Sequence, residues 1–195
     1  MSSNILPLFF AMFFGTGASY AYNYLKDRRE DIINKNRLNK FVLEGGKGMF
    51  IVVSLYFLGF ISSLSFSLFS WITYMFLIVI SVLYSGWIRI KEKFLIKNLN
   101  TGLGISLSFM VGAMVSGFVY EVMFSYALIV FMLGFAANIL GDIRGYKGDR
   151  SIGMLTLPML FGFEKTKGII YSIISFISIS VLFLNYIAFY PLIPF

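Results

Sequence analysis

The feature that most constrains this 195-residue sequence is a set of six apolar segments, each about as long as a membrane is thick. A hydrocarbon core of roughly 30 Å is crossed by about 20 apolar residues in a helix. Because lipid offers the backbone no hydrogen-bond partner, such segments are expected to be helical. The predicted spans are Ile5 to Tyr24, Gly48 to Phe66, Trp71 to Ile88, Leu99 to Tyr120, Phe124 to Leu140, and Gly168 to Tyr190.

The composition agrees with a membrane location, since 58% of the residues are hydrophobic and only 13% are charged. A soluble domain has about a quarter of its residues charged. The sequence therefore predicts an all-α, multi-pass transmembrane bundle that forms a single domain over residues 1–195. The first apolar segment leads into a charge cluster rather than a small-residue cleavage site, so we expect it to be a retained span.

The 16 Lys and Arg residues fall into three loops, which are the first, third and fifth in order. Seven lie between Lys26 and Lys47, four between Arg89 and Lys97, and five between Arg144 and Lys167. The positive-inside rule makes these loops cytoplasmic and puts both termini on the other side of the cell membrane. The net charge of +7 thus reflects membrane topology rather than nucleic-acid binding.

The first span runs directly into the charged sequence NYLKDRRED. Asn23, Asp27 and Asp31 are four residues apart, so they share one face if the helix continues past Tyr24. Oxygen ligands at this spacing suit Mg²⁺, which proteins commonly hold through one or two carboxylates and substrate phosphates. Arg37, further along this loop, could reach a phosphate. The alternative is that these carboxylates only balance neighbouring basic residues on a solvated helix end.

A second acidic cluster follows the fifth span, in the sequence GDIRGYKGDRSIGMLTLP. Asn138, Asp142, Gly145 and Asp149 are spaced by four, three and four residues, so they share one stripe if the segment is helical. The glycines are equally compatible with a loop that folds back over a bound phosphate. The alternative is that solvation of a loop alone accounts for the charges.

The third span ends in YSGWIRIKEKFLIKN, where an aromatic pair precedes four basic residues. An aromatic belt with a basic flank explains this composition without a function. The functional alternative is a cationic collar that binds an anionic headgroup or a diphosphate through charge-assisted hydrogen bonds. The residues concerned are Tyr84, Trp87, Arg89, Lys91, Lys93 and Lys97.

Two clusters of Asn followed by carboxylates, both at cytoplasmic ends of spans, favour a paired metal site. Polar groups at the end of an apolar cavity suit an amphiphile with an anionic head and an apolar tail. A polyprenyl diphosphate has this shape. The sequence has no histidine and no cysteine, which excludes imidazole-based catalysis, thiolate metal sites and disulfides.

These motifs resemble those of the UbiA family of membrane prenyltransferases. Asn23, Asp27 and Asp31 match the first signature of the family, although Tyr24 stands where most members have Asp. The second signature is similar to GDRSIGMLTLP, with Asp142 and Asp149 at acidic positions and Gly145 where the family has another Asp. A weaker pattern includes Tyr84, Ser85, Arg89, Lys91 and Asn98. The resemblance extends from about Ile5 to Phe163.

The resemblance implies a helical bundle around a lipid-accessible cavity, in which Mg²⁺ bridges aspartates and a prenyl diphosphate donor. The implied catalytic and metal-binding residues are Asp27, Asp31, Asp142 and Asp149. The implied substrate-binding residues are Asn23, Arg37, Tyr84, Arg89, Lys91, Asn138 and Lys147. Tyr20, Tyr22 and Tyr84 are candidates to shelter an allylic cation. The sequence of the second signature is most similar to that of members that prenylate geranylgeranylglyceryl phosphate, followed by members that use an aromatic acid or quinone precursor.

Compared with the family pattern, the chain begins at the second span and ends after the seventh, so spans are missing at both ends. Such a chain could be a fragment, half of a split-gene pair, a homo-oligomer that completes its own wall, or an inactive relative. The alternative to an enzyme is therefore a truncated non-catalytic relative or a membrane assembly subunit. A transporter or channel is disfavoured because the spans have almost no charged residues in mid-membrane.

Overall fold

The computed structural model describes residues 4–26, 46–86, 92–117, 120–151 and 153–189. These residues form six α-helices and contain no strand. All six helices are long and apolar enough to cross a membrane, which confirms the predicted all-helical, multi-pass architecture. The helices are α1 (Ile5–Lys26), α4 (Gly46–Ser63), α5 (Leu68–Ser85), α6 (Ile96–Val115), α7 (Tyr120–Ser151) and α8 (Leu157–Phe189).

The last two helices are longer than the sequence predicted. Helix α7 has 32 residues and continues past Leu140, the predicted end of the span. At about 1.5 Å per residue it exceeds the thickness of a hydrocarbon core. Helix α8 begins at Leu157 and is interrupted at Gly162, whose φ of 76° is left-handed. The prediction that residues 144–167 form the fifth loop was therefore wrong, because most of these residues belong to α7 and α8.

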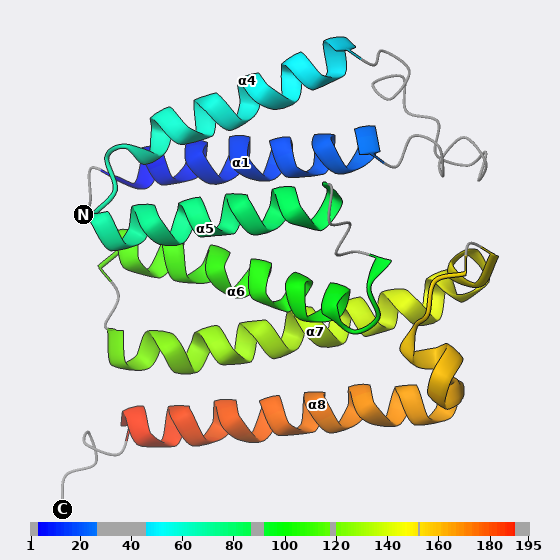
Figure 1. The fold of residues 1–195 in the computed structure, drawn as a ribbon. Helices are drawn as coiled ribbons and strands as arrows, with labels where there is room; N and C mark the ends of the chain where they lie inside the picture. Colours follow the sequence, from blue (N-terminus) through cyan, green and yellow to red (C-terminus); the bar gives the residue numbers. More distant parts are fainter. Residues whose placement is uncertain (1–3, 27–45, 87–91, 118–119, 152, 190–195) are drawn as a thin grey trace, which may run out of the picture. The chain divides into compact units, whose positions relative to one another are not determined.

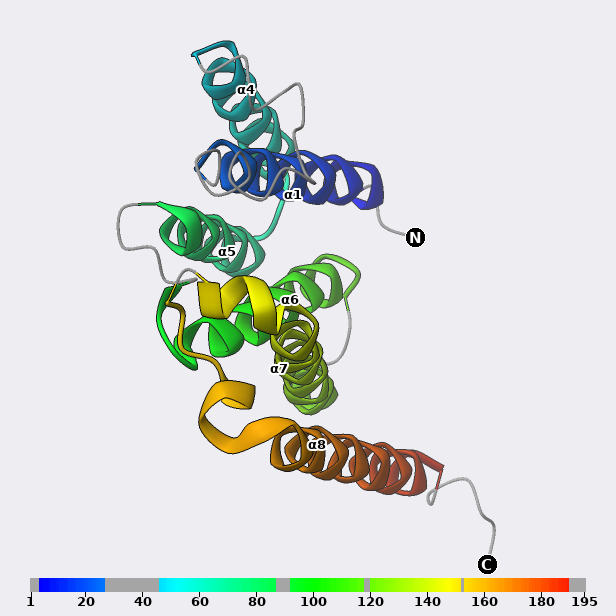
Figure 2. The same ribbon diagram turned by 90° about the vertical axis from the view of Figure 1, so that its right-hand side faces the viewer.

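The chain divides into two compact units, and each is described by itself. The first unit contains α1, α4, α5 and the end of α6, and the second contains the start of α6 with α7 and α8. The prediction of one domain over residues 1–195 stays a prediction. In the first unit, α1 lies between α4 and α5 in both views (Figures 1 and 2).

Small residues let α1 and α4 pack closely. A side chain on Gly59 would place its Cβ 3.2 Å from the backbone nitrogen of Gly15. The hydroxyl of Tyr74 fills the space beside both glycines and donates a hydrogen bond of 2.9 Å to the carbonyl of Ala11. Gly17, two residues further along α1, is not part of this contact, because a Cβ built there meets nothing within 4 Å.

The second unit is held together by antiparallel contacts between α6 and α7. A Cβ on Gly102 would lie 2.7 Å from the carbonyl oxygen of Phe131, and one on Gly134 would lie 3.1 Å from the Cα of Gly102. Further along, Ser106 Oγ donates a hydrogen bond of 2.8 Å to the carbonyl of Ala127. This close packing brings the first turn of α6 beside the polar end of α7.

The end of α7 has the hydrogen bonds of a Schellman motif. Gly153 takes a left-handed φ of 73°, its N–H bonds to Arg150 O at 3.2 Å, and the N–H of Met154 bonds to Asp149 O at 2.9 Å. Helix α8 then starts after Thr156, and Pro158 lies in its first turn, where the missing N–H is tolerated. The glycine and proline of GMLTLP thus end one helix and begin the next.

Candidate functional site

The second acidic cluster lies on continuous helix. Because α7 extends to Ser151, the residues Asn138, Asp142, Gly145 and Asp149 share one helical stripe. The helical interpretation of this segment is confirmed, and the alternative of a loop that folds back over a phosphate is wrong. The carboxylates are therefore fixed to a rigid element of the second unit.

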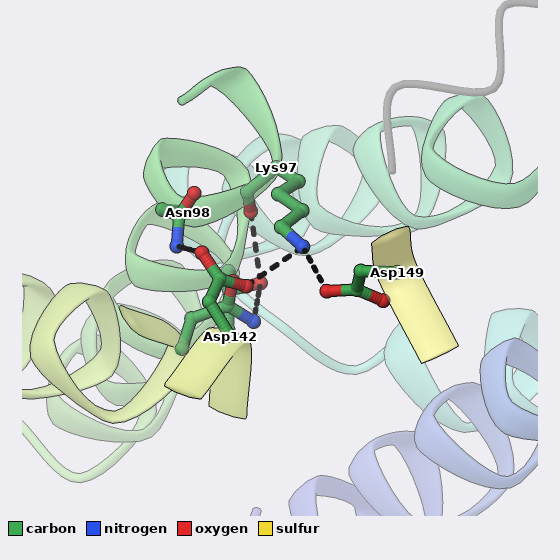
Figure 3. A network of polar contacts seen from close by, with 6 residues as sticks. Lys97, Asn98, Asp142 and Asp149 are labelled. Atoms are coloured by element: carbon green, nitrogen blue, oxygen red, sulfur yellow. Dashed lines mark hydrogen bonds and ion pairs between the residues drawn. The ribbon is translucent and has the colours of Figure 1, made fainter. Parts of the chain in front are cut away.

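The ammonium group of Lys97 lies between the two carboxylates of this stripe (Figure 3). Lys97 Nζ is 2.7 Å from Asp142 Oδ1 and 3.6 Å from Asp149 Oδ2. The side chains of Lys97 and Asp142 are 10% and 4% exposed, whereas that of Asp149 is 23% exposed. One cation thus bridges two carboxylates that are two helical turns apart.

Asp142 is also bonded by the residue next to Lys97. Asn98 Nδ2 donates a hydrogen bond of 3.0 Å to Asp142 Oδ2, so both carboxylate oxygens have partners from the start of α6 (Figure 3). A carboxylate buried to this extent is stable as a charged group only if it is paired and hydrogen-bonded. Asp142 is held in one orientation, while Asp149 keeps a more open position.

The same helix pair also positions Asn138. Its Nδ2 donates a hydrogen bond of 3.1 Å to Thr101 Oγ1, which itself donates to the carbonyl of Lys97 at 3.0 Å. The amide oxygen of Asn138 is buried and has no hydrogen-bond partner in the described part of the chain. An unpaired buried oxygen is costly, and a ligand or water that donates to it would remove this cost.

The backbone just before α6 is shaped so that Lys97 enters at this point. Leu95 has a φ of 60°, and the N–H of Ile96 bonds to the carbonyl of Phe94 at 2.6 Å, which closes a three-residue turn. Leu95 and Phe94 pack against a core formed by Ile139, Leu157 and Ile170. Apolar packing therefore compensates for an unfavourable backbone conformation beside the charged network.

The first cluster is described only at its beginning. Asn23 is half-buried near the end of α1, and Ser85 Oγ of α5 donates a short hydrogen bond of 2.6 Å to Asn23 Oδ1. With its oxygen engaged, the amide NH₂ of Asn23 remains the group that can bind an anion. The predicted site residues that lie outside the described ranges are Asp27, Asp31, Arg37, Arg89 and Lys91.

Two further predicted residues are described but lie outside the Lys97 network. Tyr84 is half-buried and directly precedes Ser85 in α5. Lys147 is exposed, and its spacing of two residues from Asp149 puts it on a different face of α7. Of the aromatic candidates, Tyr22 already has a cation partner, since Lys26 Nζ lies 5.3 Å from the centre of its ring.

Lys97 is the residue that the sequence interpretation missed, because it was counted with the basic flank of the third loop. The structure puts it inside α6 and buries it against α7. Its spacing to Thr101 would have been a signal, since polar residues at positions i and i+4 at the start of an apolar helix share one face.

The donor set is suitable for a hard divalent cation such as Mg²⁺. The two carboxylates already enclose one cationic group, the ammonium of Lys97, and further oxygen donors such as Asn138 Oδ1 are on the same stripe. Carboxylate and amide oxygens are ligands that Mg²⁺ and Mn²⁺ prefer. Across the described ranges, no cluster of three or more Asp, Glu, His or Cys side chains occurs, so a metal here would need further ligands besides Asp142 and Asp149.

Comparison with protein families gives a match over nearly the whole chain. The model of the UbiA prenyltransferase family matches residues 2–195. Among characterised relatives, the digeranylgeranylglyceryl phosphate synthase of Pyrococcus horikoshii is 28% identical over 185 residues. That alignment covers 92% of this chain and 64% of the relative.

Comparison with solved structures supports the same fold. A UbiA homolog from Archaeoglobus fulgidus bound to DMAPP and Mg²⁺ superposes with a TM-score of 0.79 at 16% identity, covering 94% of this chain and 66% of that one. The homolog bound to GPP and Mg²⁺ gives a TM-score of 0.78 at 17% identity, with the same coverage. The chain therefore spans just under two thirds of the length of the proteins it resembles.

Proposed function

Because the chain belongs to the UbiA prenyltransferase family, we propose that it transfers an isoprenyl group from a prenyl diphosphate to an acceptor at the membrane. The observation that carries this proposal is the polar end of α7, where Asp142 and Asp149 lie on either side of the Lys97 ammonium. Carboxylates are rare in membrane helices unless they have a function. The Archaeoglobus fulgidus homolog has been solved with Mg²⁺ and DMAPP or GPP, which favours such a donor here.

The proposed acceptor is geranylgeranylglyceryl phosphate, in ether-lipid synthesis. Its support is the similarity to the digeranylgeranylglyceryl phosphate synthase of Pyrococcus horikoshii, at 28% identity. An aromatic acid or quinone precursor is the second choice. In either case the acceptor hydroxyl or ring carbon forms a bond to the allylic carbon and loses a proton. The C–O bond of the donor breaks, and the diphosphate leaves with the bonding electron pair.

The chain's own polar residues would bind the donor's anionic head. Asp142 and Asp149, with Asp27 and Asp31 of the first cluster, are proposed to hold Mg²⁺, assisted by Asn138. When bound, Mg²⁺ would stabilise the charge that develops on the departing diphosphate. Asn23 could donate its amide N–H to a phosphate oxygen, since the hydrogen bond from Ser85 uses only its carbonyl oxygen.

The remaining substrate contacts are proposed from the basic and aromatic residues near the cytoplasmic ends. Basic side chains neutralise phosphate by charge-assisted hydrogen bonds. Tyr84, which directly precedes Ser85 in α5, is proposed as an aromatic contact for the substrate. The proposed phosphate-binding residues are Arg37, Arg89, Lys91 and Lys147.

The proposed arrangement in the membrane puts the active face in the cytoplasm and both termini outside. The basis is the distribution of all 16 Lys and Arg residues over alternate loops and helix ends. Membrane lipids surround the helices. A second copy of the chain, or the product of a split gene, is the proposed partner where further helices are needed to enclose the prenyl tail.

The test is prenyl transfer by purified protein in lipid vesicles, with radiolabelled geranylgeranyl diphosphate, Mg²⁺ and each class of acceptor. We expect labelled product from the wild type and a loss of about 100-fold in rate for Asp149→Asn, because one of the carboxylates proposed to hold Mg²⁺ is removed, and Mg²⁺ would stabilise the leaving group. Asp27→Ala should lower the rate similarly.

The matched control is Glu164→Gln, which makes the same carboxylate-to-amide change at a side chain that is 86% exposed. This variant should keep the wild-type rate. Equal rates for Asp149→Asn and Glu164→Gln would remove the acidic stripe from the mechanism. Absence of labelled product with every acceptor would favour the alternative function, a non-catalytic relative or assembly subunit.

A further inference from the structure

The ammonium of Lys97 lies between Asp142 and Asp149, the two carboxylates of the second unit that are proposed to hold a metal ion. Its distances of 2.7 and 3.6 Å to the two carboxylates are those of a shared counter-ion (Figure 3). The position is enclosed, since the Lys97 and Asp142 side chains are 10% and 4% exposed. A metal ion at the same carboxylates would be close to this ammonium, and two positive charges repel each other strongly where water is scarce.

A divalent cation and this ammonium therefore compete for the same carboxylates. Lys97 has a flexible side chain of four methylene groups, so its charge can withdraw without movement of α6. Asp142 would keep its orientation in that event, because Asn98 still donates to its second oxygen at 3.0 Å. The acidic stripe is thus prepared to accept a cation once the ammonium leaves.

We infer that Lys97 is a built-in counter-ion that competes with the divalent cation for Asp142 and Asp149 and weakens metal binding while no anionic substrate is present. The inference rests on the proposed function, since it takes the acidic stripe as a metal site. It assigns to Lys97 a regulatory role at that site. A bound diphosphate would offer the displaced ammonium a new anionic partner.

The test is Mn²⁺ binding by the purified full chain in detergent, without diphosphate, followed by the electron paramagnetic resonance signal of free Mn²⁺. Lys97→Gln removes the competing charge but can still donate a hydrogen bond to Asp142. We expect its dissociation constant for Mn²⁺ to fall about tenfold, because the charge-assisted bond that the metal must replace is absent. Lys165→Gln, the same change at an exposed lysine of the second unit, should bind Mn²⁺ as the wild type does.

The double variant Lys97→Gln, Asp149→Asn locates the metal. It should lose the gain in Mn²⁺ affinity that Lys97→Gln alone gives, since the carboxylate of Asp149 is absent. Because Lys97→Gln leaves a buried carboxylate undercompensated, its thermal unfolding midpoint is a second measurement. Mn²⁺ should raise that midpoint more in Lys97→Gln than in the wild type, as the metal replaces the missing positive charge.

The outcomes separate this inference from the proposed function. If the wild type binds Mn²⁺ and Lys97→Gln binds it equally or more weakly, the competition is overturned and the metal site remains. If the double variant keeps the gain, the metal lies elsewhere and the inference is again wrong. If neither the wild type nor Lys97→Gln binds Mn²⁺ or is stabilised by it, the inference and the metal site fail together.

Discussion

The two compact units connect their helices through different polar chemistry. In the first unit, Ser19 Oγ donates a hydrogen bond of 2.9 Å to Ser81 Oγ, and Tyr56 OH lies 3.4 Å from both hydroxyls. All three groups are neutral. In the second unit, α6 and α7 are joined by the charged network around Lys97 and Asp142. Among the described residues, the buried ion pairs lie in this second unit.

This difference separates neutral hydrogen bonds between packed helices from the charges of the candidate site. Hydroxyl groups can bond within their own helix when a partner is lost, so each contact between helices contributes modestly. A buried charge has no such substitute, and removal of one partner leaves the other uncompensated. Buried charges in membrane helices are therefore expected at functional sites, and hydroxyl contacts are expected where helices only pack against each other.

The largest effect on stability is expected for Asp142→Ala, which strands the buried ammonium of Lys97. Breaking a buried ion pair from one side costs about 3–5 kcal/mol. The thermal unfolding midpoint in detergent should fall sharply. Asp149→Asn is the matched comparison, because its carboxylate is 3.6 Å from Lys97 and 23% exposed, and its cost should stay below about 1 kcal/mol. Equal midpoints for the two variants would contradict the network as described.

An intermediate effect is expected for Gly102→Ala, at the close approach of α6 and α7. The added methyl group would lie 2.7 Å from the carbonyl oxygen of Phe131, and a backbone atom cannot move aside easily. Overpacking of this kind costs about 1–3 kcal/mol. Gly112→Ala, further along the same helix, has no neighbour within 4 Å and should be neutral or slightly stabilising.

The midpoint of thermal unfolding distinguishes the two glycine variants, and the Gly102 variant should also shift the metal affinity of the neighbouring site. A neutral result for Gly102→Ala would mean that α6 and α7 are further apart than the structure shows.

The smallest effect is expected for Ser81→Ala in the first unit. Ser19 Oγ loses a partner at 2.9 Å but retains the carbonyl of Gly15 at 2.8 Å. Side-chain hydrogen bonds between membrane helices average about 0.6 kcal/mol, so the midpoint should change by little. Ser62→Ala is the control, since Ser62 Oγ bonds only to Leu58 O of its own helix. A cost above about 2 kcal/mol for Ser81→Ala would erase the contrast between the units.

The helices were predictable because the requirement for internal backbone bonding in lipid acts on each segment alone. Span positions were correct to within a few residues for α1, α4 and α5. The extended end of α7 was not predictable, because Gly141, Gly145 and Gly148 lower helix propensity locally. The contacts of α7 with α6 and α8 outweigh that preference.

The candidate site was predictable in part. The stripe of Asn138, Asp142 and Asp149 followed from spacing, and its helical form confirms that they share one side of α7. The partner of these carboxylates was not predictable, because Lys97 is 45 positions before Asp142 in the sequence. Hydropathy put Lys97 in a basic flank, and only packing of the helices buries it.

The sequence alone determined that this protein is a multi-pass helical membrane protein. The length of each apolar segment and its need for internal backbone hydrogen bonds in lipid are properties of that segment alone. The sequence also indicated the residue types of the candidate site, an Asn followed by two carboxylates on one helical stripe. The tertiary structure decided which charges meet. Close packing at Gly102 and Gly134 brings α6 against α7, and this contact places the ammonium of Lys97 between two aspartates.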